Sequence, residues 1–342
     1  MHVLVTGGAG YIGTTLVPML LARGHRVTVV DRFYFGDTLA NVGSDGMLSR
    51  VRADVRRVDP RVFEGVEAVV DLAGISNDPA CELDASLTRS VNLEGSRRVH
   101  RLAQAAGVSR VVVASSCSVY GHGEGTQLVE TSPRHPVSLY AQCKADVEDS
   151  LLELGRATTM TVTALRFATV FGVSRRMRFD LAVNVMTKNA YTQRRIVVDG
   201  GGKQWRPFVH VRDVSEAIAR TLEAERSRVA GQVINVGSTE NNLRILTLGY
   251  RIRDAIPGTQ VEVSGSDPDL RDYNVNFDKL RAVLDWSPRV SVDEGIAEVH
   301  AALRAGEIDP DDRRGYTLKT YVFLAEVERS FREVAIDGMI LG

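Results

Sequence analysis

A tyrosine and a lysine four residues apart form the first pair in the chain that could carry out acid–base chemistry. Tyr140 and Lys144 lie in a stretch with a helical pattern, and residues i and i+4 share one face of a helix. A phenol ordinarily ionises near pH ~10, and a nearby positive charge lowers that pKa by favouring the phenolate. The pair therefore predicts a phenol that exchanges protons near neutral pH, although the same spacing alone is common on solvated helix faces.

A group of hydroxyls supplies a second chemical signal. Ser115, Ser116 and Ser118 follow the β-branched run Val111–Ala114. Open α/β sheets bind their ligands at the carboxyl ends of strands, where a hydroxyl can share a hydrogen bond with a substrate. Ordinary turn chemistry at a strand end is the alternative interpretation. Together with Tyr140 and Lys144, Ser116 is predicted to be catalytic.

A glycine-rich turn predicts a dinucleotide site. The apolar run Val3–Val5 leads into Thr6–Gly13, which reads TGGAGYIG, and then into a helical pattern. Glycines there let the backbone approach a pyrophosphate, which the helix N-terminus attracts. Asp31 ends the next strand, where an acidic side chain can hydrogen-bond the adenosine ribose. Its carboxylate would repel a 2′-phosphate and so favours NAD over NADP, whereas Arg32 beside it favours NADP weakly.

Short apolar runs alternate with helical stretches through the first half of the chain. The runs are apolar throughout, as strands covered on both faces should be, and the alternation predicts a parallel sheet with helices on both sides. The runs are Val3–Val5, Arg26–Val30, Ala68–Leu72, Val111–Ala114 and Thr161–Leu165. The predicted fold is α/β, a doubly wound Rossmann sheet with a smaller α/β substrate-binding lobe.

The alternation of apolar runs with helical stretches ends after Arg166, which suggests where the two lobes divide. Residues 1–166 are predicted to form the NAD-binding domain, with 207–237 returning to it. Residues 167–206 and 238–304 are predicted to form the substrate lobe; the basic run 175–180 lies there without assigned contacts. The tail 305–342 has an amphipathic pattern near Thr317–Val334, which predicts a packing or subunit-contact role.

Composition excludes several other classes of protein. The 342 residues carry 42 Lys+Arg and 43 Asp+Glu, without the basic excess typical of nucleic-acid binding. No apolar run approaches the ~20 residues of a membrane span, and the N-terminus has no signal-peptide pattern. Three widely spaced cysteines predict neither a disulfide framework nor a metal site, and so a cytoplasmic location.

The order of these motifs resembles the extended short-chain dehydrogenases/reductases of the nucleotide-sugar epimerase/dehydratase group, from Thr6 to about His300. Asp54-Val55 is similar to the family's adenine-contacting pair, and Asn92 to its helix asparagine. The segment 71–74 stands at the family's strand end beside the cofactor. The resemblance implies NAD, a nucleotide-diphosphate-sugar substrate and a homodimer. The implied cofactor contacts are Gly7, Gly10, Tyr11, Ile12, Gly13, Asp31, Arg32, Asp54, Val55, Leu72, Ala73, Gly74, Asn92, Tyr140 and Lys144.

The resemblance also implies a set of substrate contacts. Arg206 stands at the family's diphosphate-binding arginine, and Arg271 is similar to a second one. Guanidinium groups pair bidentately with phosphate oxygens, although isolated arginines mostly form surface ion pairs. Thr169 stands where the family often has Asn, so its phosphate contact departs from the family pattern. The predicted substrate-binding residues are Ser116, Cys117, Ser118, Thr169, Arg206 and Arg271.

The reaction is predicted by elimination. The family's 4,6-dehydratases usually carry Asp-Glu where this chain has Cys117 and Ser118, so we expect an epimerase that acts through a transient 4-keto sugar. Cys117 is interpreted as a small packing residue, or else as an unusual proton donor. A 4,6-dehydratase, a 4-dehydrogenase or ketoreductase, and a non-catalytic dinucleotide sensor remain the alternatives.

Overall fold

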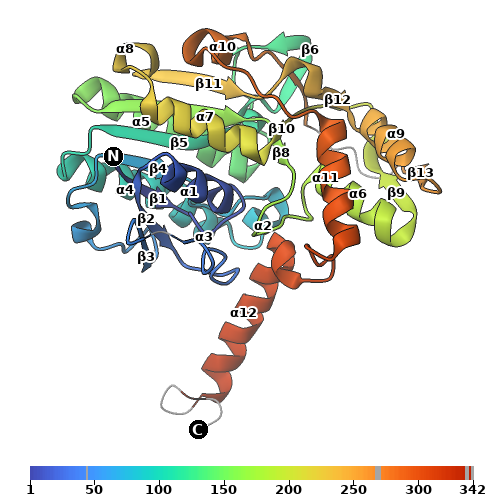
Figure 1. The fold of residues 1–342 in the computed structure, drawn as a ribbon, viewed down its shortest axis with the longest axis horizontal. Coiled ribbons are helices and arrows are strands. Elements are labelled where there is room, and N and C mark those ends of the chain that lie inside the picture. The colour runs from blue at the N-terminus through green and yellow to red at the C-terminus, as the bar shows by residue number, and fades with distance from the viewer. Residues whose placement is uncertain (44, 266–270, 336–338, 340–342) are drawn as a thin grey trace.

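A seven-stranded parallel sheet forms the centre of the computed structural model (Figure 1), which describes the chain except residues 44, 266–270, 336–338 and 340–342. The strand order is β11-β7-β5-β4-β1-β2-β3. The strands are β1 (His2–Thr6), β2 (Arg26–Asp31), β3 (Leu48–Arg52), β4 (Ala68–Asp71), β5 (Arg110–Ser116), β7 (Thr161–Phe167) and β11 (Gln232–Val236). The order reverses between β1 and β4, which is where doubly wound sheets bind ligands. The predicted fold class is confirmed.

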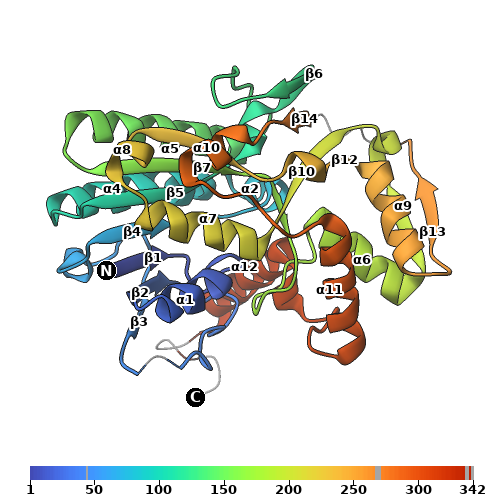
Figure 2. The ribbon, with the colours of Figure 1, turned by 45° about the horizontal axis from the view of Figure 1, so that its top comes forward.

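Both faces of the sheet are covered because alternate side chains of each strand point to opposite sides. Val3 and Val5 pack with α1 (Gly13–Ala22) and α7 (Val211–Glu223) in one apolar cluster. Leu4, between them in the sequence, packs with α4 (Ser96–Ala105) and α5 (Leu139–Ala157) in the other. In Figure 2, α1 and α7 lie in front of the strands, on the face of the sheet that is turned toward the viewer. The apolar strand pattern is thus explained by burial on two sides.

The smaller lobe is built from three small sheets and three longer helices. β8 (Thr169–Phe171), β10 (Trp205–His210) and β12 (Asn242–Arg244) form one sheet. The segment that begins at 207 therefore starts in this small sheet, and the chain rejoins the central sheet at β11. The other pairs are β6 (His122–Leu128) with β14 (Asp272–Val275), and β9 (Arg195–Val198) with β13 (Gln260–Val263). The helices are α6 (Ala182–Gln193), α9 (Ile245–Ala255) and α11 (Val292–Ala305).

The remaining helices are short, apart from the last one. The short ones are α2 (Asp78–Glu82), α3 (Ala85–Arg89), α8 (Arg226–Val229) and α10 (Asp278–Leu284). A π-helical turn over Ser90–Gly95 leads directly into α4. The helix α12 (Thr317–Val334) starts against the body and projects away from it (Figure 1). In the part of the chain that the structure describes, no helix has the length and apolar character that crossing a membrane requires.

Candidate active site

The turn after β1 lies at the floor of a cavity at the β1/β4 switch point. Gly7, Gly10 and Gly13 line this cavity, which we call the dinucleotide cavity. Gly7 has a φ of +66°, and a Cβ there would lie 2.9 Å from the backbone of Ala73. A Cβ on Gly13 would clash with the carbonyl of Gly8. The glycines are thus required by close backbone packing, and they leave N–H groups of the turn and of α1 near the cavity.

Asp31 and Arg32 occupy different environments in the dinucleotide cavity. The Asp31 carboxylate accepts hydrogen bonds from the backbone N–H groups of Ala9 at 3.0 Å and Phe33 at 2.7 Å. Burial raises the pKa of Asp31 above its usual value. Arg32 pairs instead with Asp54 at 2.8 Å, and Arg56 also pairs with Asp54. The Asp31 carboxylate therefore lines the dinucleotide cavity, whereas the Arg32 guanidinium is engaged by Asp54.

The end of β4 forms another wall of the dinucleotide cavity. Leu72, Ala73 and Gly74 line it, and Val55 lines it from the segment after β3. Asn92 lies outside this lining, where its side-chain amide holds the backbone of Ile75. Its Oδ1 accepts from the Ile75 N–H at 2.7 Å, and its Nδ2 donates to the Ile75 carbonyl at 2.9 Å. The arrangement gives Asn92 a supporting position behind the strand end rather than a place in the cavity wall.

Tyr11 and Ile12 have different positions in the same turn. The buried Tyr11 hydroxyl donates to the Gly172 carbonyl at 2.7 Å, and the amide of Asn184 donates to that hydroxyl at 3.1 Å. Tyr11 therefore ties the glycine turn to the substrate lobe. Ile12 lines both the dinucleotide cavity and its neighbour.

Ser116, Tyr140 and Lys144 meet in that neighbouring cavity, which we call the substrate cavity. Ser116 ends β5, where its Oγ accepts from the Ser118 N–H at 3.1 Å. Ser138 caps the start of α5 by accepting from the Ala141 N–H at 3.2 Å, so that Tyr140 lies in the first turn. Seven residues line both cavities, so the two are contiguous: Ile12, Leu72, Gly74, Ile75, Ser76, Val170 and Arg178.

The electrostatics of Tyr140 differ from the sequence-based expectation. Burial raises the pKa of Tyr140 well above its usual value, and the positive charge of Arg178 only partly opposes this shift. Lys144 lies with its ammonium 5.7 Å from the centroid of the Tyr140 ring and donates to the Ala114 carbonyl at 2.7 Å. Burial also lowers the pKa of Lys144. A lowered phenol pKa was therefore the wrong expectation for the protein alone, because desolvation outweighs the charge nearby.

A pH titration tests this conclusion. In protein stripped of cofactor, we expect the Tyr140 phenol to ionise above pH ~10. The ultraviolet absorbance of phenolate, compared between wild type and Tyr140→Phe, isolates this group. Oxidised NAD carries a positive nicotinamide ring, which should lower the pKa when it binds. A Tyr140 transition below pH ~10 in the stripped protein would contradict the dominance of burial.

The predicted substrate residues divide into two groups. Ser116, Ser118 and Thr169 line the substrate cavity, as do Arg206 and Arg271. Cys117 does not: it is 1% exposed and belongs to the apolar core. Its Sγ donates to the Arg166 carbonyl at 3.4 Å, and burial raises its pKa. The structure therefore corrects the placement of Cys117 among substrate contacts and supports its interpretation as a packing residue.

The two arginines of the substrate cavity are held by neighbouring groups. Arg206 donates to the carbonyls of Trp205, at 2.7 Å, and of Arg271. Its guanidinium lies 5.1 Å from the centroid of the Tyr273 ring. Arg271 pairs with Asp78 at 2.5 Å. The two side chains are thus held in the lining of the cavity, to which they bring positive charge.

Sequence patterns gave no specific role to several residues that line the cavities. Arg178 borders both, donates to the Ser76 carbonyl at 2.8 Å and pairs with Asp180 at 2.6 Å. In the sequence, Arg178 was noted only as part of the basic run 175–180, without a role of its own. Tyr321 of α12 lines the dinucleotide cavity, and the amphipathic pattern of the tail did not indicate that contact. Among the described residues, no group of three or more His, Cys, Asp or Glu side chains could hold a metal ion.

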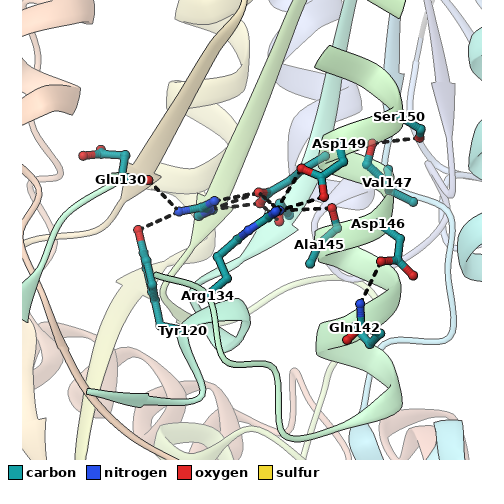
Figure 3. Close-up of polar contacts among 12 residues, drawn as sticks. Tyr120, Glu130, Arg134, Gln142, Ala145, Asp146, Val147, Asp149 and Ser150 are labelled. Carbon is teal, nitrogen blue, oxygen red and sulfur yellow. Dashed lines mark hydrogen bonds and ion pairs between the residues drawn. The ribbon is translucent and has the colours of Figure 1, made fainter. Parts of the chain in front are cut away.

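A buried ion pair fixes the elements that carry the catalytic residues. Glu148 of α5 is 1% exposed and pairs with Arg166 of β7, which is 3% exposed, at 2.7 Å. Glu148 also accepts from the Ser115 hydroxyl of β5, next to Ser116. The Arg166 guanidinium lies 2.9 Å from the Tyr120 hydroxyl and donates to the Glu130 carbonyl, and Arg134 donates to Glu148; Figure 3 labels Tyr120, Glu130 and Arg134. The network holds β5, α5 and β7 together beneath the site.

Known proteins resemble this chain over most of its length. A model of the NAD dependent epimerase/dehydratase family matches residues 3–237. The UDP-glucose 4-epimerase of Mycolicibacterium smegmatis is 31% identical over 87% of this chain and 97% of its own. The UDP-glucuronic acid decarboxylase 2 of Arabidopsis thaliana is 28% identical over 86% of this chain, which spans 66% of that protein.

A solved structure extends the similarity to a third reaction. The NAD-dependent NDP-hexosamine 5,6-dehydratase TunA, involved in tunicamycin biosynthesis, superposes with a TM-score of 0.79. It is 26% identical, and the match covers 91% of this chain and 99% of that one. The expected cofactor, NAD, is confirmed. The matched relatives thus epimerise, decarboxylate or dehydrate, and the chain belongs to the NAD-dependent epimerase/dehydratase family of nucleotide-sugar-modifying enzymes.

Proposed function

We propose that this enzyme is a 4-epimerase that acts on a nucleotide-diphosphate sugar through a transient 4-keto intermediate. The observation that carries the proposal is the meeting of Ser116, Tyr140 and Lys144 in a cavity contiguous with the dinucleotide cavity. A sugar hydroxyl held at Ser116 and Tyr140 would place its carbon beside the junction of the two cavities. A non-catalytic sensor would not need these three groups together.

The steps assigned to the protein are proton transfers and orientation. Ser116 would hydrogen-bond the 4-oxygen while Tyr140, as phenolate, takes its proton. Oxidised NAD, when bound, would supply the acceptor for the hydride of C4 and a positive charge that lowers the pKa of the phenol. The resulting ketone must turn within the cavity before the hydride returns to its other face and Tyr140 returns the proton. Arg206 and Arg271 would hold the diphosphate throughout.

The carboxylates of the substrate cavity favour epimerisation over elimination. Dehydration needs an acid and a base on the sugar, and the position after Cys117 holds Ser118. Among the described residues that line this cavity, the carboxylates are Asp78 and Asp180. Each is paired with an arginine, Arg271 or Arg178, so neither is available as a ready acid–base partner.

A substrate screen tests the proposal. Purified protein is incubated in deuterated water with UDP-, GDP-, dTDP- and CDP-sugars, including a uronic acid, without added cofactor, and followed by NMR. We expect a 4-epimer with no deuterium on carbon. Deuterium on carbon with loss of water would show a dehydratase. Loss of CO2 from the uronic acid would show a decarboxylase, because a carboxylate β to the 4-ketone leaves readily. Turnover only after NAD(P)(H) is added would show a dehydrogenase or reductase.

The expected homodimer and cytoplasmic location stay predictions of the sequence. A homodimer is implied by the family resemblance. Exposed apolar side chains on the projecting part of α12, among them Val327, Phe331 and Val334, are compatible with a subunit contact there.

A further inference from the structure

The first turn of the C-terminal helix α12 contributes to the dinucleotide cavity. Leu318 and Tyr321 pack against the cluster of Ile75, Ala80 and Cys81, which follows the end of β4. Tyr321 also lines the cavity together with Asp31 and the glycine turn. Beyond this turn, α12 leaves the body of the protein (Figure 1). The helix therefore has one end at the cofactor site and one end outside it.

Tyr321 packs on the loop that follows Asp31. Its ring lies 5.8 Å from the Tyr34 ring and 5.9 Å from the Phe35 ring, centroid to centroid, and both contacts are edge-on. Phe33, in the same loop, has a φ of +56°. Non-glycine residues in the left-handed region are strained and are held by their surroundings. Tyr321 thus supplies contacts that keep the loop, and with it Asp31, in place.

A buried arginine lies beside Tyr321 in the same cavity wall. Arg176 is 4% exposed, and its guanidinium lies 3.7 Å from the centroid of the Phe35 ring. One of its terminal nitrogens donates to Thr317 Oγ1 of α12 at 3.0 Å. Its Nε is buried and has no hydrogen-bond partner among the described residues, and no described carboxylate forms an ion pair with it. Burial lowers the pKa of Arg176 to about 10.

A buried cation that forms no ion pair is costly in a folded protein, and the carboxylates of Asp180 and Asp31 offset this cost for Arg176 only in part, through space. Arg176 lines the cavity whose glycine turn suits a diphosphate. A diphosphate is an anion, so its charge is opposite to that of Arg176. The guanidinium of Arg176 is planar and carries several N–H donors, which suits it to bind an anion. Its Nε has no hydrogen-bond partner among the described residues, and its face packs on the Phe35 ring. The protein itself thus leaves a cation in place for the ligand.

We propose that α12 is part of the cofactor site: Tyr321 and the Thr317–Arg176 pair close the outer wall of the dinucleotide cavity over NAD, and Arg176 binds its diphosphate. The tail then determines how long the enzyme retains its cofactor. This inference concerns NAD alone and stands apart from the sugar reaction proposed above.

The base of α12 is anchored firmly enough to serve as a wall. The Phe179 N–H donates to the Gly315 carbonyl at 2.7 Å, just before the helix. The Thr320 hydroxyl donates to the Arg313 carbonyl at 2.8 Å, and Tyr316 donates to the Pro310 carbonyl at 2.6 Å. The segment carrying Arg176 and the start of α12 are therefore tied together and would enclose NAD as a unit.

The test measures release of NAD from purified holoprotein into a trap, an unrelated NAD-dependent dehydrogenase with its own substrate. Two aromatic contacts are lost in Tyr321→Ala, so we expect release about tenfold faster than from wild type. Tyr321→Phe keeps the ring contacts with Tyr34 and Phe35 and should release NAD within about twofold of the wild-type rate. Tyr250→Ala removes an exposed tyrosine of α9 that lines neither cavity; it is the matched control and should release NAD at the wild-type rate.

Release from Tyr321→Ala at the wild-type rate would overturn the proposal, as would an equal acceleration in Tyr250→Ala. Hydrogen exchange of the wild-type protein provides a measurement that does not depend on variant folding. Added NAD should slow exchange of amides in residues 317–324 and leave residues 327–334 unchanged. Unchanged exchange in 317–324 would also overturn it. Because NAD is the readout, these results are independent of which sugar reaction the enzyme performs.

Discussion

Tyr140→Phe is expected to lower kcat by about 10²–10⁴-fold, which is the usual contribution of a positioned acid–base group. The change removes one hydroxyl and leaves the ring that packs beside the cluster of Ile75, Ala80 and Cys81. Cofactor content and melting temperature should therefore stay close to those of wild type. Initial rates with the sugar found in the screen, normalised to bound NAD, measure the effect.

Tyr250→Phe is the control for this substitution. Tyr250 lies in α9 and is 42% exposed, away from both cavities. Its loss of a hydroxyl should leave kcat unaltered. If Tyr140→Phe turned over sugar at the wild-type rate with full NAD content, Tyr140 would not be the acid–base group, and the mechanism proposed above would be wrong.

Glu148→Gln is expected to destabilise the protein by about 3–5 kcal/mol, because it leaves the buried charge of Arg166 without its carboxylate. The substitution keeps the size of the side chain, so a cavity cannot account for the loss. Glu148 also accepts from Ser115, and we expect the strand end that carries Ser116 to shift with it. Urea unfolding followed by circular dichroism gives the free energy.

Asp149→Asn is the matched control on the next residue of the same helix. Asp149 pairs with Arg134 at 2.9 Å, as Glu148 does at 3.3 Å, but its side chain is 61% exposed. Exposed ion pairs contribute at most about 1 kcal/mol, so this variant should unfold almost as the wild type does. Equal losses in the two variants would contradict the assignment of stability to burial of the Glu148–Arg166 pair.

Local sequence patterns were sufficient to predict the central sheet and the glycine turn that forms the floor of the dinucleotide cavity. Strands buried on both faces are apolar at most positions, and the glycine turn owes its residues to backbone packing within a few ångströms, as at Gly7 and Ala73. Such features are set by neighbours in the chain or by adjacent strands. The place of Ser116 followed from its position at the carboxyl end of β5, where parallel sheets bind ligands, and it lines the same cavity as Tyr140.

Long-range packing determined what the sequence could not predict. The pKa of Tyr140 depends on how many groups exclude water from it, which spacing along a helix does not reveal. Cys117 lies one residue beyond Ser116, yet its side chain turns into the core. Tyr321 reaches the cofactor cavity from more than 300 residues beyond the glycine turn. The amphipathic pattern of α12 indicated only that one side is apolar, not what covers it.

Tracing the hydride of C4 tests the central claim most directly. A nucleotide sugar deuterated at C4, identified by the screen, is converted by the purified protein without added cofactor, and the product is analysed by mass spectrometry and NMR. The proposed mechanism predicts a 4-epimer that retains the deuterium at C4, because the hydride is removed and returned within one site. Deuterium found at another carbon of a dehydrated product, or left on NAD beside a released ketone, would contradict it.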